Sequence, residues 1–114
     1  MHLILGGAYQ GKLTWAVSQF GLTPDELCDL SAGFQPGKRC YYHLEAATRA
    51  GTAPDAAQFP DDAIVISREV GSGVVPMDAD VRLWREAHGA LLQQLARRAA
   101  HVTRIFCGLP EQLK

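Results

Sequence analysis

Apolar and polar positions divide the chain into short, almost uniformly apolar runs and longer segments in which apolar residues recur at helical spacing. Short apolar runs bounded by turn residues are typical of buried strands. They predict strands at residues 2–7, 27–30, 63–67 and 101–110. The helical spacing predicts helices at residues 11–21, 41–51 and 81–99. Strands that alternate with helices pair in parallel through right-handed crossovers, so the pattern predicts a compact α/β sandwich.

The last predicted helix is amphipathic, with an apolar stripe along one face. The stripe consists of Val81, Trp84, His88, Leu91, Leu92, Leu95 and Ala99. Asp80 stands just before this stripe, and we expect its carboxylate to cap the helix. Because His88 belongs to the stripe, we expect a hydrogen-bonded core or interface histidine there.

Composition excludes several classes of partner. The chain has 114 residues and a formal net charge of −1, which suits one domain over residues 1–114 and argues against binding to nucleic acid or to membrane surfaces. Its three cysteines form no CxxC pair, so we expect reduced thiols in a cytoplasmic protein. No leader pattern or long apolar run is present, and we expect no membrane insertion.

The first predicted strand and helix flank a glycine-rich stretch, "GGAYQGKLT". Gly6, Gly11 and Lys12 follow the spacing G-x-x-x-x-G-K of a phosphate-binding loop, in which backbone amides, a helix N-terminus and a lysine surround phosphate oxygens. Leu13 stands where such loops place Ser or Thr for Mg²⁺, and Thr14 lies about 100° further around the helix. The alternative is an ordinary strand-to-helix turn with an exposed lysine.

With this loop, the predicted fold is a P-loop NTPase-like three-layer sandwich with a small, mostly parallel sheet. The predicted nucleotide-binding residues are Gly6, Gly7, Ala8, Tyr9, Gln10, Gly11, Lys12, Leu13 and Thr14.

The second half of the chain carries a more distinctive set of residues. They are Glu69, Val70, Gly71, Gly73, Val75, Pro76, Arg82, Arg85, Gly89, Gln94, Gly108 and Lys114. Together with the opening loop, this set resembles the adenosylcobinamide kinase / adenosylcobinamide-phosphate guanylyltransferase family of cobalamin biosynthesis. The chain departs from the family at Leu13, at Arg68 (Asn in the family) and at Glu86 (Asp in the family), and its middle is shorter.

The resemblance implies GTP or ATP with Mg²⁺, a corrinoid substrate and a homo-oligomer. Glu69 follows a buried strand, at the sheet edge where ligands bind, and is expected to hold the metal or orient the substrate hydroxyl. Arg82 and Arg85 share one flank of a helix and are expected to bind phosphate. The alternatives are a solvated loop glutamate and a solvated helix face.

His43 is the histidine whose distance from the glycine loop resembles that of the residue that carries GMP in the bifunctional enzymes. Its sequence surroundings differ from theirs, and the alternative is a helix-start histidine packed beside Tyr41 and Tyr42. The sequence thus predicts an adenosylcobinamide kinase with Lys12, Glu69 and His43 as candidate catalytic residues, and guanylyl transfer as a second step if His43 carries GMP. The alternative function is a non-catalytic nucleotide- or corrinoid-binding protein, or a subunit, derived from that family.

Overall fold

The computed structural model describes residues 1–8, 10–69 and 78–114. Tyr9 of the predicted loop and the motif residues Val70, Gly71, Gly73, Val75 and Pro76 lie outside these ranges. The described elements are β1 (His2–Gly6), α1 (Lys12–Phe20), η1 (Pro24–Glu26), β2 (Leu27–Asp29), β3 (Cys40–Tyr42), α2 (Leu44–Ala50), η2 (Ala56–Gln58), β4 (Ile64–Arg68), α3 (Ala79–Arg98), β5 (His101–Phe106) and β6 (Leu109–Gln112).

All six strands join one sheet in the order β2-β3-β4-β1-β5-β6. The first five strands in this order run parallel to one another, and β6 pairs with β5 in the antiparallel direction. The central strand β1 places Leu3 opposite Val65 of β4 and Val102 of β5. All three side chains are buried, as expected for parallel strands covered on both faces.

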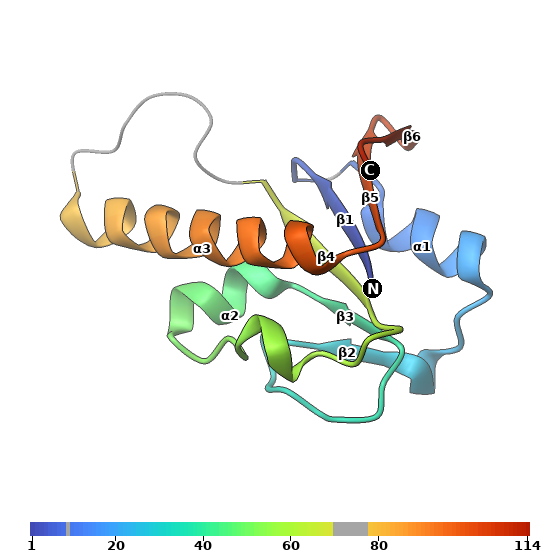
Figure 1. Cartoon of the computed structure of the whole chain (residues 1–114), viewed down its shortest axis with the longest axis horizontal. Helices are drawn as coiled ribbons and strands as arrows, with labels where there is room; N and C mark the ends of the chain where they lie inside the picture. The colour runs from blue at the N-terminus through green and yellow to red at the C-terminus, as the bar shows by residue number, and fades with distance from the viewer. Residues whose placement is uncertain (9, 70–77) are drawn as a thin grey trace.

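Two apolar clusters lie on opposite faces of this sheet, because successive strand residues point to opposite sides. Leu3 and Val65 pack with residues of α2 and α3, such as Leu44 and Leu95. Their strand neighbours, exemplified by Ile4, pack with α1. Figure 1 shows α1 on one side of the sheet and α2 with α3 on the other. The predicted three-layer α/β sandwich with a mostly parallel sheet is therefore confirmed.

The predicted helix over residues 41–51 is wrong at its start. Cys40–Tyr42 form strand β3, and α2 begins only at Leu44. Pairing of Cys40 and Tyr41 with β4 buries both side chains, which outweighs the local helical pattern. The chain turns between strand and helix at His43, whose φ of 60° lies in the left-handed region.

The predicted closing strand is a hairpin instead. Phe106 of β5 pairs with Leu109 of β6 across a two-residue turn at Cys107 and Gly108. Both turn residues have positive φ, 52° and 75°, which is the type I′ geometry that matches strand twist. The dipeptide Cys-Gly is a weaker turn signal than Asn-Gly. The sequence pattern therefore predicted one strand over residues 101–110 instead of two strands joined by a turn.

The cap of α3 also differs from the prediction. Asp78, not Asp80, is the N-cap residue: its Oδ1 accepts from the backbone N–H groups of Asp80 at 2.8 Å and Val81 at 3.2 Å. A cap must stand one residue before the helix so that its side chain reaches the second and third N–H groups. Because α3 begins at Ala79, Asp80 lies within its first turn.

Arg98 at the end of α3 holds the connector that precedes β4. Its guanidinium donates to the carbonyl oxygens of Ala56 and Phe59 and pairs with Asp61. Phe59 is buried in the core on this face of the sheet.

Within the described ranges, no helix is both long enough and apolar enough to cross a bilayer.

Candidate functional site

The glycine loop leaves β1 at the carboxyl edge of the sheet, where open parallel sheets bind ligands. A Cβ atom on Gly6 would lie 2.6 Å from the carbonyl oxygen of Ile105, so this glycine is required for β1 to approach β5. Gly11 is the N-cap of α1 with a φ of 82°, a conformation that favours glycine. The structure therefore requires glycine at these two positions for different reasons, close strand packing at Gly6 and a left-handed backbone at Gly11.

The C-terminal hairpin holds this loop from one side. The backbone N–H of Cys107 donates to the Gln10 side-chain oxygen at 2.5 Å, and the N–H of Gly108 donates to the Gln10 carbonyl at 3.0 Å. This contact joins residues nearly a hundred positions apart in the chain. It fixes the loop immediately before α1.

Lys12 is the first residue of α1, and its ammonium group donates to the Gly7 carbonyl at 2.7 Å. Burial lowers the pKa of Lys12, the nearby charge of Arg68 adds to this, and Glu45 and Glu69 oppose it. The first turn of α1, all of it described, contains no acidic residue, and Gly11 supplies no side-chain cap. The first N–H groups of α1 therefore add a partial positive charge next to Lys12.

A cavity of about 390 Å³ opens beside Lys12, within the size range of small-molecule sites. Its lining comes from the loop and α1, the junction of β3 and α2, and the end of β4. The lining residues are Ala8, Gln10, Gly11, Lys12, Leu13, Thr14, Tyr42, His43, Glu45, Ile66, Ser67 and Arg68. The structure thus brings most of the predicted loop together with His43, while Gly6 and Gly7 are not part of the lining.

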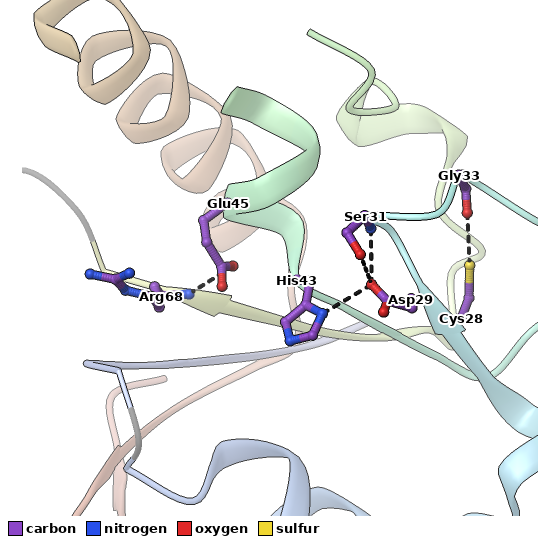
Figure 2. Close-up of polar contacts among 7 residues, drawn as sticks. All are labelled: Cys28, Asp29, Ser31, Gly33, His43, Glu45 and Arg68. Atoms are coloured by element: carbon purple, nitrogen blue, oxygen red, sulfur yellow. Dashed lines mark hydrogen bonds and ion pairs between the residues drawn. The ribbon is translucent and has the colours of Figure 1, made fainter. Parts of the chain in front are cut away.

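His43 is held by an acidic partner that was not selected from the sequence. Its Nδ1 lies 2.9 Å from Oδ1 of Asp29, at the end of β2. The same oxygen accepts from the backbone N–H of Ser31 at 2.9 Å and from its hydroxyl at 2.6 Å (Figure 2). Partial burial raises the pKa of Asp29, but the bonds from Ser31 and His43 outweigh it and leave the pKa below its usual value.

Glu45 brings a carboxylate into the cavity from the first turn of α2. One of its oxygens accepts from the backbone N–H of Arg68 at 3.3 Å, which ties α2 to the end of β4 (Figure 2). Neither Glu45 nor Asp29 was among the residues predicted from the sequence. Glu69 was selected because it follows a predicted strand, whereas Asp29 lies within the strand predicted at residues 27–30 and ends the observed strand β2, so the same signal did not select it.

Glu69 continues the pairing of β4 with β1, since its backbone N–H donates to the Gly6 carbonyl at 3.0 Å. Its carboxylate forms an ion pair with Arg104 of β5 at 3.4 Å. The residue is not part of the cavity lining, but it is close enough to influence the pKa of Lys12.

Arg82 and Arg85 lie in the first turns of α3, of which Arg82 is exposed and Arg85 is partly buried. Figure 1 shows this end of α3 far from α1. Neither residue lines the cavity, so the structure does not bring these two arginines together with Lys12.

Behind the cavity, His88 is fully buried and joins three elements. Its Nε2 lies 2.9 Å from the Ser67 hydroxyl of β4, and its Nδ1 lies 2.9 Å from the Thr48 hydroxyl of α2. Burial lowers the pKa of His88, against smaller raising effects of the Arg68 carbonyl and Glu45. The prediction of a hydrogen-bonded core histidine is confirmed.

The described residues contain no group of three or more His, Cys, Asp or Glu side chains that could hold a resident metal ion. Mg²⁺ in phosphate sites needs only one or two carboxylates, because substrate phosphates and water complete its shell. Glu45 in the cavity and Glu69 near Lys12 are carboxylates of this kind. The residues therefore fit a Mg²⁺ ion that arrives with a nucleotide.

Comparison with known proteins identifies the family. No curated protein matches the chain. The family model described as cobinamide kinase / cobinamide phosphate guanyltransferase matches residues 41–113, more than half of the chain. The match includes His43, Glu69, Arg82 and Arg85, and it begins after the glycine loop. The chain therefore belongs to the cobinamide kinase / cobinamide phosphate guanyltransferase family, a family of P-loop NTPases.

Proposed function

We propose that the chain is a nucleotide-dependent adenosylcobinamide kinase that binds GTP or ATP in the cavity beside Lys12. One observation carries the proposal: a single cavity combines a half-buried lysine, the uncapped N-terminus of α1 and a carboxylate. A lysine and a helix N-terminus suit phosphate oxygens, whose negative charge offsets the desolvation of the ammonium group.

Phosphoryl transfer depends mainly on placement and on stabilising charge, so few side chains are needed. Lys12 would exchange its bond to the Gly7 carbonyl for the terminal phosphates. Glu69 would orient the aminopropanol hydroxyl of the corrinoid. Arg82 and Arg85, which do not line the cavity, remain proposed ligands of substrate or phosphate. Mg²⁺, held by Glu69 and Glu45 directly or through water, would neutralise charge on the phosphates. Thr14 lines the cavity and is the hydroxyl nearest in sequence to the Ser or Thr that Leu13 replaces.

A second activity, guanylyl transfer, is favoured by the contact between His43 and Asp29. With Nδ1 bonded to Asp29, Nε2 is the ring nitrogen that remains for the cavity. In the proposed step, Nε2 forms a bond to the α-phosphorus of GTP while the bond to pyrophosphate breaks. The phosphate of adenosylcobinamide phosphate then displaces the imidazole and takes the GMP group.

The alternative is a nucleotide- or corrinoid-binding protein, or a subunit, without catalysis. The replacement of Ser or Thr by Leu13 and the short middle of the chain favour it. Homo-oligomerisation also remains a prediction. Among the described residues, the large exposed apolar side chains are Leu83, Phe106, Leu109 and Leu113.

A transfer assay separates kinase from binding protein. The purified chain is incubated with adenosylcobinamide, Mg²⁺ and either γ-labelled GTP or γ-labelled ATP, and labelled corrinoid is measured. We expect label transfer that falls by on the order of 100-fold in Lys12→Ala, since this removes a charge aimed at the transferred group. Lys38→Ala, which removes a lysine that contacts Asp25 instead of the cavity, is the matched control. Nucleotide binding without any transfer supports the non-catalytic alternative.

A further inference from the structure

The contact between Asp29 and His43 crosses from one strand end to the start of a helix. Asp29 is the last residue of β2 and lies opposite Tyr42 in the parallel pairing of β2 with β3. His43 follows Tyr42 directly, so this register places the carboxylate beside the imidazole. The left-handed backbone of His43, with a φ of 60°, is uncommon outside glycine and is found most often at turns and functional sites.

The hydrogen bonds around Asp29 determine which ring nitrogen of His43 carries the proton. Oδ1 of Asp29 accepts from the N–H and the hydroxyl of Ser31, so it acts as an acceptor. A carboxylate oxygen has no hydrogen to give to Nδ1 of His43, and Nδ1 must therefore be the donor. In the neutral imidazole the lone pair is then on Nε2. In Figure 2 the second ring nitrogen of His43 is turned away from Asp29.

We propose that Asp29 is a positioning residue that holds His43 with the proton on Nδ1, so that Nε2 is the nucleophile toward the α-phosphate. This inference rests on the guanylyl transfer proposed above. When Nε2 bonds to phosphorus and pyrophosphate leaves, no proton has to be removed from the ring, because the Nδ1 proton stays in its bond to Asp29. The substituted ring becomes a cation, and the Asp29 carboxylate offsets its charge.

Ser31 provides a control within the same cluster. Its hydroxyl and its backbone N–H both donate to Oδ1 of Asp29, the same oxygen that Nδ1 of His43 contacts. Ser31→Ala removes one bond from the turn but leaves the contact between Asp29 and His43. A purely structural role of Asp29 in this turn would give the variants Asp29→Ala and Ser31→Ala similar properties.

The tautomer of His43 can be measured without any turnover. Nitrogen-15 spectra of the histidine side chains, recorded at alkaline pH and assigned with His43→Gln, distinguish a proton on Nδ1 from a proton on Nε2. We expect the Nδ1–H form in the unmodified chain and in Ser31→Ala, and a shift toward the Nε2–H form in Asp29→Ala. An Nε2–H form in the unmodified chain, or an unchanged tautomer in Asp29→Ala, overturns the inference.

Covalent labelling with α-labelled GTP then tests the link to chemistry. We expect label on His43, formed about 10- to 100-fold more slowly in Asp29→Ala and close to the original rate in Ser31→Ala. Equal labelling rates in all three chains overturn the positioning role. If the spectra show the expected tautomers but no chain takes label, Asp29 does hold His43 as inferred, and the guanylyl transfer proposal is the part that fails.

Discussion

At the scale of single residues, the glycine motif meets two demands that do not involve a ligand. Gly6 allows β1 to lie against β5, and Gly11 provides the left-handed turn into α1. Packing and backbone geometry would select both glycines even in a chain that binds nothing. The feature that calls for a ligand is Lys12, whose ammonium group is partly desolvated and donates to a backbone carbonyl instead of a carboxylate.

Gly6→Ala tests the packing role of the first glycine. A Cβ atom 2.6 Å from a backbone oxygen forces two paired strands apart, so we expect the free energy of unfolding to fall by about 1–3 kcal/mol. Gly89→Ala is the matched control, because it lies within α3 and, within the described part of the chain, the added Cβ has no atom within 4 Å apart from its chain neighbours and the backbone of its own helix. We expect this control to gain up to about 1 kcal/mol from helix propensity. Urea unfolding of both variants measures the difference, and equal stability of Gly6→Ala and the parent chain would contradict the close approach.

At the scale of elements, the ring of His88 connects the helical layer to the sheet. Its two nitrogens bond to Thr48 in α2 and Ser67 in β4, while its own backbone belongs to α3. Ser67 and Arg68 also line the cavity, so this buried contact supports the cavity from behind. Removing the ring would take one hydrogen bond from each hydroxyl, leaving Thr48 bonded to the Leu44 carbonyl and Ser67 to the Arg68 carbonyl.

The pKa of His88 makes the stability of this contact depend on pH. Burial lowers the pKa of His88 from 6.5, so the folded chain keeps the ring neutral while the unfolded chain takes up a proton. The contribution of His88 to the free energy of unfolding is therefore fully present above about pH 6.5. It decreases as the pH falls below this value, until the lowered pKa of the folded chain is reached. His2, whose pKa burial also lowers, contributes in the same direction.

Urea unfolding at several values between about pH 7.5 and pH 5 checks this dependence. We expect His88→Gln to lose stability less steeply than the parent chain as the pH falls, and His2→Gln to remove a separate part of the slope. We also expect the free energy of unfolding of His88→Ala to be about 1–3 kcal/mol lower at neutral pH, because a fully buried ring and its hydrogen bonds to Ser67 and Thr48 are lost. A parent chain whose stability is flat over this range would refute the assignment.

At the scale of the whole molecule, the sequence predicted the layers correctly because the signals for them are local. The apolar runs at the two central strands and the stripe on the long helix are visible within a few residues. Strand β3 was missed because it has only three residues and is fixed by neighbours on both sides. Such pairing depends on which strands lie side by side in the sheet, and the local sequence pattern does not determine this.

The same distinction applies to the candidate site. Lys12, His43 and the loop could be selected from motif and resemblance, and the structure places Lys12, His43 and most of the described loop around one cavity. The partners that hold them, such as Asp29 for His43 and the hairpin turn for Gln10, come from distant parts of the chain. Arg82 and Arg85 were selected from the resemblance and from their spacing on one helix flank, but the length of α3 places its first turns away from α1.

The central claim is that the cavity beside Lys12 binds a nucleoside triphosphate. Calorimetric titration with GTP and with ATP, each with and without Mg²⁺, tests it most directly on the parent chain, Lys12→Ala and the control Lys38→Ala. We expect binding by the parent chain and by Lys38→Ala, and at least about tenfold weaker binding by Lys12→Ala, which corresponds to about 1.4 kcal/mol. Absence of binding by either nucleotide at millimolar concentration, or undiminished binding by Lys12→Ala, would contradict the account.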